Sequence, residues 1–161
     1  IMNFNNKNQI TGYLLAGVML LALLNSAYFF LSIVKQGFFE WLAFNACSLS
    51  IIIYLVCFIC FKVTKKDLFL AVALLPQYFY GTMGLFVMPW NEANMFAQIT
   101  HIIITLNVLW ILFMLLKNSK FESIGKGLLI GILLFVPVFA VIQSYMQLHM
   151  DTFMQMLQNI K

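Results

Sequence analysis

The sequence predicts an all-helical, polytopic membrane protein: a five-helix transmembrane bundle with an amphipathic helical extension at its C-terminal end. Of its 161 residues, 63% are hydrophobic and only 9% are charged, whereas soluble domains carry about 25% charged residues. Five apolar stretches are each long enough for a hydrocarbon core of about 30 Å, which takes about 20 helical residues. Open strands are disfavoured because their backbone polar groups would be unsatisfied in lipid. We therefore treat residues 1–161 as a single transmembrane domain.

The five spans follow one another with short breaks between them. We predict helices over residues 10–34, 38–61, 68–88, 95–116 and 124–148. Connections this short make consecutive helices antiparallel neighbours. Pro76 and Pro137 each remove a helical hydrogen bond, so we expect bends in the third and fifth spans. Gly127 and Gly131 have the GxxxG spacing that lets helices approach closely, and packing within the chain is favoured over a dimer contact.

A second helical pattern continues beyond the fifth span. Its apolar side is formed by Met146, Met150, Phe153, Met154, Leu157 and Ile160, and its polar side by Gln147, Asp151, Gln155 and Gln158. Because the bilayer is already crossed near Leu148, we expect an amphipathic helix that leaves the membrane or bends along its surface.

The lysines indicate the orientation of the chain. Lys7, Lys62, Lys65, Lys66, Lys117, Lys120 and Lys126 fall on one side of the predicted membrane, and Lys35 and Lys161 fall on the other. The positive-inside rule then predicts a cytoplasmic N-terminus and an outer C-terminus in the plasma membrane of a bacterium or archaeon. Trp41 and Trp90 fall at the outer interface, where such rings prefer to lie. The short lysine loops fit membrane topology and not nucleic-acid binding, so the expected partner is the lipid bilayer.

Polar side chains within the spans gather at one depth, in the outer half or near the midplane. Burying such groups in hydrocarbon costs free energy unless they are paired or hydrated. We therefore predict a polar pocket open to the outside and lined by Asn25, Asn45, Gln77, Tyr80, Asn94, Gln98, His101, Thr105, Gln143 and Ser144. The alternative is that these groups only hold the helices together.

The fourth span carries the sharpest polar pattern. Asn91, Asn94, Gln98, His101 and Thr105 lie within an arc of roughly 80° on a helix, and the pattern ends near the midplane. This favours the wall of a blind cavity over a through-pore. Asn107 falls on nearly the opposite face and is left out of the predicted pocket.

Few residues are candidates for chemistry. An intramembrane His is a functional candidate by default, so His101 with Glu92 or Glu40 is the only catalytic arrangement that we consider. The outer His and carboxylate residues lack any metal-ligand spacing, and Cys57 and Cys60 form a lone CxxC pair. We therefore expect no metal and no cofactor.

Three functions are compatible with these patterns. The favoured one is the binding or transport of a small or lipophilic ligand in the outer pocket. The first alternative is an accessory or assembly subunit, or a homo-oligomer, whose polar residues pair with another membrane protein. The second alternative is a membrane-embedded enzyme that uses a His–Glu pair. A His–carboxylate hydrogen bond would favour the enzyme, and polar groups facing outward would favour the subunit.

Overall fold

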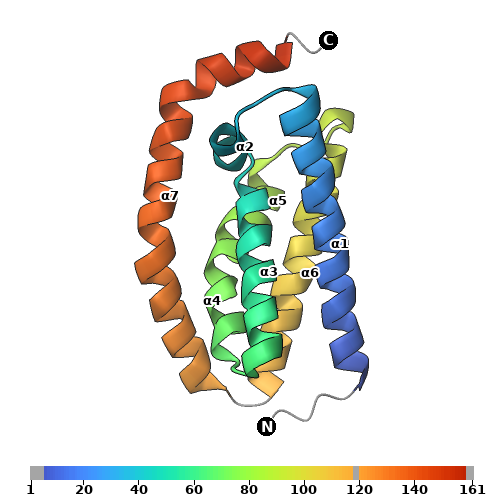
Figure 1. Ribbon diagram of the computed structural model, residues 1–161, viewed down its shortest axis with the longest axis vertical. Coiled ribbons are helices and arrows are strands. Elements are labelled where there is room, and N and C mark those ends of the chain that lie inside the picture. The colour runs from blue at the N-terminus through green and yellow to red at the C-terminus, as the bar shows by residue number, and fades with distance from the viewer. Residues whose placement is uncertain (1–5, 118–119, 159–161) are drawn as a thin grey trace.

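The computed structural model describes residues 6–117 and 120–158, and these residues form an all-helical bundle (Figure 1). Helix α1 (Asn6–Ala27) continues into a π-helical turn, η1 (Tyr28–Ile33). Then follow α2 (Phe38–Phe44), α3 (Ala46–Thr64), α4 (Leu68–Pro76), the π-helical turn η2 (Gln77–Thr82), α5 (Gly84–Val87), the 3₁₀ turn η3 (Glu92–Asn94), α6 (Met95–Lys117) and α7 (Phe121–Gln158).

Five helical segments of the described chain are long and apolar enough to cross a membrane, as the sequence predicts. They run over Asn8–Ile33, Ala46–Thr64, Leu68–Val87, Met95–Lys117 and Phe121–Gln155. The turn between α3 and α4, the C-terminal end of α6 and the N-terminal end of α7 lie at the same end of the bundle (Figure 1). This end carries Lys62, Lys65, Lys66, Lys117, Lys120 and Lys126, and we refer to it as the lysine end.

The prediction of one helix over residues 38–61 is wrong at its N-terminal end. Asn45 leaves the helical conformation, with φ −124° and ψ 59°, and separates α2 from α3. The second span therefore begins at Ala46. Trp41 and Ala43 of the short α2 are buried, and Phe44 stacks on Phe153 of α7 at 4.1 Å between ring centroids. These contacts hold α2 as a separate element beneath the end of α7.

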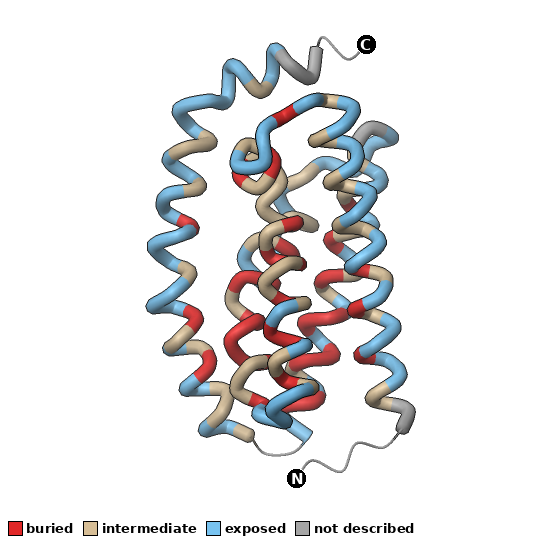
Figure 2. Tube along the Cα trace, viewed as in Figure 1, coloured by how far each residue is buried: buried red, intermediate tan, exposed pale blue. Residues whose placement is uncertain are grey.

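The core lies between α3, α4 and α6, with α1 and α7 on the two flanks (Figure 1). Buried residues gather in the half of these central helices nearer the lysine end (Figure 2). Pro76 ends α4, and because it has no N–H, the wider turn η2 begins directly after it. Helix α7, in contrast, runs through Pro137 without a break.

Helix α7 packs mainly on α4. A Cβ on Gly127 would lie 2.3 Å from Cβ of Ala71, and a Cβ on Gly131 would lie 3.4 Å from the carbonyl oxygen of Val72. The GxxxG pair therefore serves packing within the chain. Further along, Phe139 is buried against Phe79, and the helix then bends over α2 (Figure 1).

The prediction that the chain stays helical beyond Leu148 is confirmed, because α7 continues to Gln158. At about 1.5 Å per residue, this helix is roughly 57 Å long, nearly twice a hydrocarbon core of about 30 Å.

Candidate functional site

The predicted site residues fall into separate hydrogen-bonded groups. The first, which we call the Ser26 cluster, joins α1, α2 and α3 around one hydroxyl group. Ser26 Oγ accepts hydrogen bonds from Trp41 Nε1 at 3.0 Å and from Asn45 Nδ2 at 2.6 Å, and lies 3.0 Å from Ser48 Oγ. Because two donors occupy the lone pairs of Ser26, its own proton is best directed at Ser48. Of the four, only Asn45 belongs to the predicted site.

A second group, the Gln77 cluster, lies in the core where α3, η2 and α6 meet. Gln77 Nε2 donates to the carbonyl oxygen of Ser50 at 2.9 Å, and Asn107 Nδ2 donates to Gln77 Oε1 at 3.2 Å. All three residues are fully buried, as is Tyr54. The hydroxyl group of Tyr54 and Oδ1 of Asn107 have no hydrogen-bond partner among the described residues.

The Gln77 cluster includes Asn107, a residue left out of the predicted pocket. Asn107 falls on nearly the opposite face of α6 from the polar pattern, yet it bonds directly to Gln77, one of the predicted residues. The helix positions of Gln98, His101 and Asn107 are all buried, so α6 is enclosed over a wider arc than its polar pattern indicates.

His101 has a backbone partner. Its ring is buried, and Nδ1 lies 2.7 Å from the carbonyl oxygen of Gly81. Nδ1 must therefore carry the proton and donate it, because a carbonyl oxygen only accepts. A Cβ on Gly84 would lie 2.3 Å from the His101 ring, so the ring fills the space left by that glycine. Thr105 Oγ1 donates to the carbonyl oxygen of His101 at 2.8 Å.

The carboxylates considered as catalytic partners of His101 lie elsewhere. Glu40 accepts a hydrogen bond from the N–H of Gly37 at 2.8 Å, at the start of its own helix. Glu92 is exposed on η3. The His–carboxylate hydrogen bond that would favour an enzyme is thus not found among the described residues.

Two further predicted residues, Asn94 and Gln98, form hydrogen bonds to the loop before α6. Asn94 Nδ2 donates to the carbonyl oxygen of Pro89 at 3.1 Å, and its N–H donates to Asn91 Oδ1 at 2.9 Å. Gln98 is fully buried and its Nε2 donates to the carbonyl oxygen of Met88. These amides hold the preceding loop against the helix.

The remaining predicted residues lie apart from these groups. Asn25, Gln143 and Ser144 are exposed. Tyr80 is half-buried, with its ring edge-on to Phe139 at 4.6 Å. The ten predicted residues are therefore distributed over the Ser26 cluster, the Gln77 cluster, the surroundings of His101, the start of α6, the contact of Tyr80 with Phe139, and the exposed surfaces of α1 and α7.

An apolar groove lies between α4, α6 and α7, nearer the lysine end. It has a volume of about 200 Å³ and is lined by Leu74, Leu75, Tyr78, Val108, Leu112, Ile124 and Leu128. Sequence analysis missed it because leucine and valine within a span give no local signal. The groove arises only where three helices fail to close completely.

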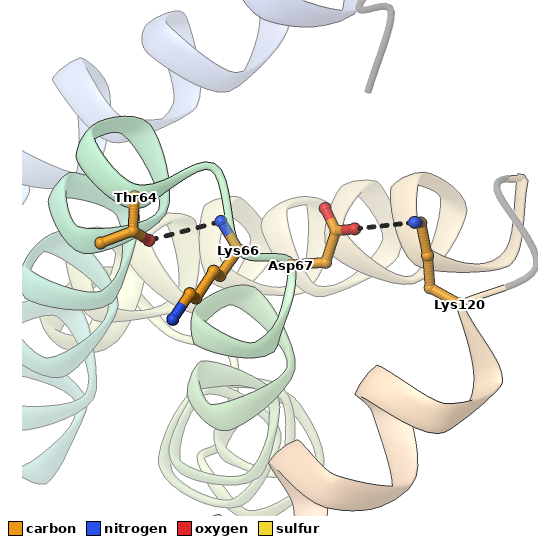
Figure 3. Close-up of polar contacts among 4 residues, drawn as sticks. All are labelled: Thr64, Lys66, Asp67 and Lys120. Atoms are coloured by element: carbon orange, nitrogen blue, oxygen red, sulfur yellow. Dashed lines mark hydrogen bonds and ion pairs between the residues drawn. The ribbon is translucent and has the colours of Figure 1, made fainter. Parts of the chain in front are cut away.

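Charged side chains form ion pairs at the lysine end of the bundle, close to the groove. Lys120 Nζ lies 3.6 Å from Asp67 Oδ2, and the two side chains face each other from the residue before α7 and the turn before α4 (Figure 3). In the same turn, the N–H of Lys66 donates to Thr64 Oγ1 (Figure 3). Lys126 pairs with Glu122 within α7.

Among the residues that the structure describes, no three His, Cys, Asp or Glu side chains are grouped so that they could hold a metal ion. Comparisons with protein-family models, with curated proteins and with solved structures find no match to the chain.

Proposed function

We propose that the chain is an integral membrane protein that binds a lipophilic ligand in the groove between α4, α6 and α7. The apolar lining of this groove is the observation that carries the proposal. Of the ligands that the sequence leaves open, small or lipophilic, a lipophilic one fits better. A polar ligand in the outer half would have to compete with the hydrogen bonds that already occupy Asn45, Gln77 and His101.

The size and chemistry of the groove support an apolar guest. Apolar cavities of about 150 Å³ stay dry and take up molecules the size of benzene, and this groove holds about 200 Å³. A hydrocarbon segment there would gain dispersion contacts with Leu74, Val108 and Leu128 without displacing any hydrogen bond.

A pair of substitutions on neighbouring residues tests the proposal. Leu128→Trp would fill the groove from its α7 wall, whereas Leu129→Trp would place the same side chain on the exposed side of that helix. We expect purified wild-type protein and the Leu129 variant to retain bound lipid through detergent exchange, measured by native mass spectrometry. The Leu128 variant should lose it. Equal retention by both variants would refute the proposal.

The proposed orientation places the lysine end in the cytoplasm of a bacterium or archaeon, following the positive-inside rule. Exposed positions at the two ends, Lys66 and Lys35, provide the test. Single cysteines would be introduced there in a variant in which Cys47, Cys57 and Cys60 are replaced. An impermeant thiol reagent added to intact cells should label the cysteine at position 35 and not that at position 66. The reverse pattern would invert the topology.

A second candidate function, as a subunit of a homo-oligomer, is favoured by Asn25. This amide is exposed on α1 and makes no hydrogen bond in the described chain. It lies about 7 Å from the middle of the Asn8–Ile33 span, where an unpaired polar group in lipid is costly. An amide both donates and accepts, so the same residue of a second copy would satisfy it across a two-fold axis. Gly17, exposed two turns away on the same face, would allow close approach.

Self-association in lipid bilayers would separate this second candidate from the first. Förster transfer between labelled copies should fall for Asn25→Leu and stay unchanged for Gln143→Leu, an equally exposed amide on α7. Unchanged Förster transfer for Asn25→Leu would remove the support for an oligomer, and it would not affect the proposal that the groove binds a lipophilic ligand.

A further inference from the structure

We infer that the ligand is an anionic phospholipid, whose acyl chain occupies the groove and whose phosphate lies against Lys117 and Lys120. This inference rests on the proposed function of the groove. It adds the chemical class of the ligand and assigns it a headgroup site at the corner between α6 and α7.

Along the helix axes, the two lysines lie beyond the end of the groove. Leu112 and Ile124, which line it, belong to the last turns of α6 and the first turn of α7. Lys117 ends α6 and Lys120 immediately precedes α7. Each lysine is therefore only about 6 to 8 Å further along its helix than the apolar residue that lines the groove. In a phospholipid, the phosphate lies at a similar distance from the first carbons of the acyl chain.

The charges at this corner are incompletely neutralised. Asp67 pairs with Lys120, and Glu122 pairs with Lys126. Lys65, Lys66 and Lys117 have no carboxylate within ion-pair distance among the described residues, and all three are exposed. Lys117 instead lies over the ring of Phe113, with Nζ 5.4 Å from the ring centroid. Its ammonium group thus stands at the end of α6 with no carboxylate paired to it in the described chain.

Lys120 contributes differently from Lys117. Its Nζ is shared with Asp67 Oδ2, but an ammonium group has three donors, so hydrogens remain for a phosphate oxygen. The ion pair also fixes the position of this ammonium group between α4 and α7, two of the three helices that form the groove. Asp67 is buried while Lys120 is partly exposed, so the open side of the pair is cationic.

Charge complementarity selects the headgroup. Basic side chains at the cytoplasmic end of transmembrane helices attract anionic lipids, and each lysine contributes about a fivefold gain in affinity at low salt. A neutral phosphocholine headgroup would gain little from the same site, because its own ammonium group would meet the lysines. The apolar groove favours a lipid over free phosphate as the source of the phosphate group, since free phosphate has no acyl chain to bury among the leucines.

The experiment measures competition between two lipids that differ in headgroup charge. Wild-type protein is reconstituted with equal amounts of phosphatidylglycerol and phosphatidylcholine of identical chains, and the retained ratio is read by native mass spectrometry. We expect an excess of phosphatidylglycerol. Lys117→Gln should lower that ratio about fivefold, and Lys35→Gln, an exposed lysine at the other end, should not change it. Lys120→Gln provides a second variant, with folding checked by size-exclusion chromatography.

The outcomes separate this inference from the function on which it rests. If Leu128→Trp abolishes retention of both lipids while Lys117→Gln and Lys120→Gln leave the ratio unchanged, the groove binds lipid but the headgroup site is refuted. If wild-type protein retains neither lipid, both proposals fail. If soluble glycerol phosphate displaces the retained lipid, the site recognises phosphate without the groove, and the lipid assignment is overturned.

Discussion

Gly127→Ala should destabilise the protein, although alanine is the better helix former. A Cβ at this position would lie 2.3 Å from Cβ of Ala71, 2.9 Å from the backbone carbonyl carbon of Ala71 and 3.0 Å from the backbone nitrogen of Val72. Two of these atoms belong to the backbone of α4, so no side chain can rotate away. Helix α7 must instead move outward by about an ångström, and overpacking of this kind costs about 1–3 kcal/mol.

Gly125 supplies a matched control on the same helix. A Cβ there would meet nothing within 4 Å, so Gly125→Ala should keep the helix-propensity gain of about 0.5–1 kcal/mol. Because both variants share that gain, the difference between their free energies of unfolding isolates the packing cost of about 1–3 kcal/mol.

Denaturant unfolding in one detergent, followed by circular dichroism, measures this difference. The Gly127 variant should also retain less lipid, because Leu128 of the groove is its neighbour. If the two alanine variants are equally stable, α7 does not pack on α4 as described, and the groove loses one of its walls.

Three further predictions concern the polar and aromatic contacts. Gln77→Leu and Asn107→Leu should each destabilise the protein, and a double-mutant cycle should give a coupling of about 0.6–1.7 kcal/mol; additive effects would show that the amides do not bond. His101→Ala should lower the free energy of unfolding by about 2 kcal/mol without changing lipid retention by the folded fraction, and a selective loss of retention would restore a functional role. Phe44→Ala should speed hydrogen exchange in the last turns of α7, because its ring stack is worth about 0.5–1.5 kcal/mol, whereas Phe39→Ala, exposed on the same short helix, should leave exchange unchanged.

The spans could be predicted from the sequence because each is a long apolar run between polar breaks. Four of the five begin and end within a few residues of the expected positions when the extended end of α7 is set aside. The second differs because the run over residues 38–61 is interrupted only by Asn45, a residue that a continuous helix tolerates. Tertiary contacts interrupt the helix there. Asn45 Nδ2 donates to Ser26 on another helix, and Phe44 stacks on Phe153, more than a hundred residues later in the chain.

The candidate site was harder to predict, because depth along a helix is a local property and orientation is not. The sequence indicates that Gln77 and His101 are buried polar groups, and both are. It cannot indicate that Gln77 meets Asn107 or that His101 meets the carbonyl oxygen of Gly81, because each pairing depends on how two helices are rotated about their axes. The small residues Ser26 and Ser50 gave no signal at all, although Ser26 is the meeting point of its cluster and Ser50 accepts a hydrogen bond from Gln77.

The distribution of these contacts makes α7 different from the other spans. The Ser26 and Gln77 clusters join α1, α2, α3, η2 and α6 through side-chain hydrogen bonds. In the part of the chain that the structure describes, α7 meets its neighbours through glycine contacts and stacked rings, with no side-chain hydrogen bond to another helix. Contacts of that kind can be exchanged for contacts with hydrocarbon at little cost, since lipid tails are as apolar as leucine. An acyl chain could therefore enter beside α7 without leaving any buried polar group unpaired, and this is a physical reason for the groove to lie along this helix.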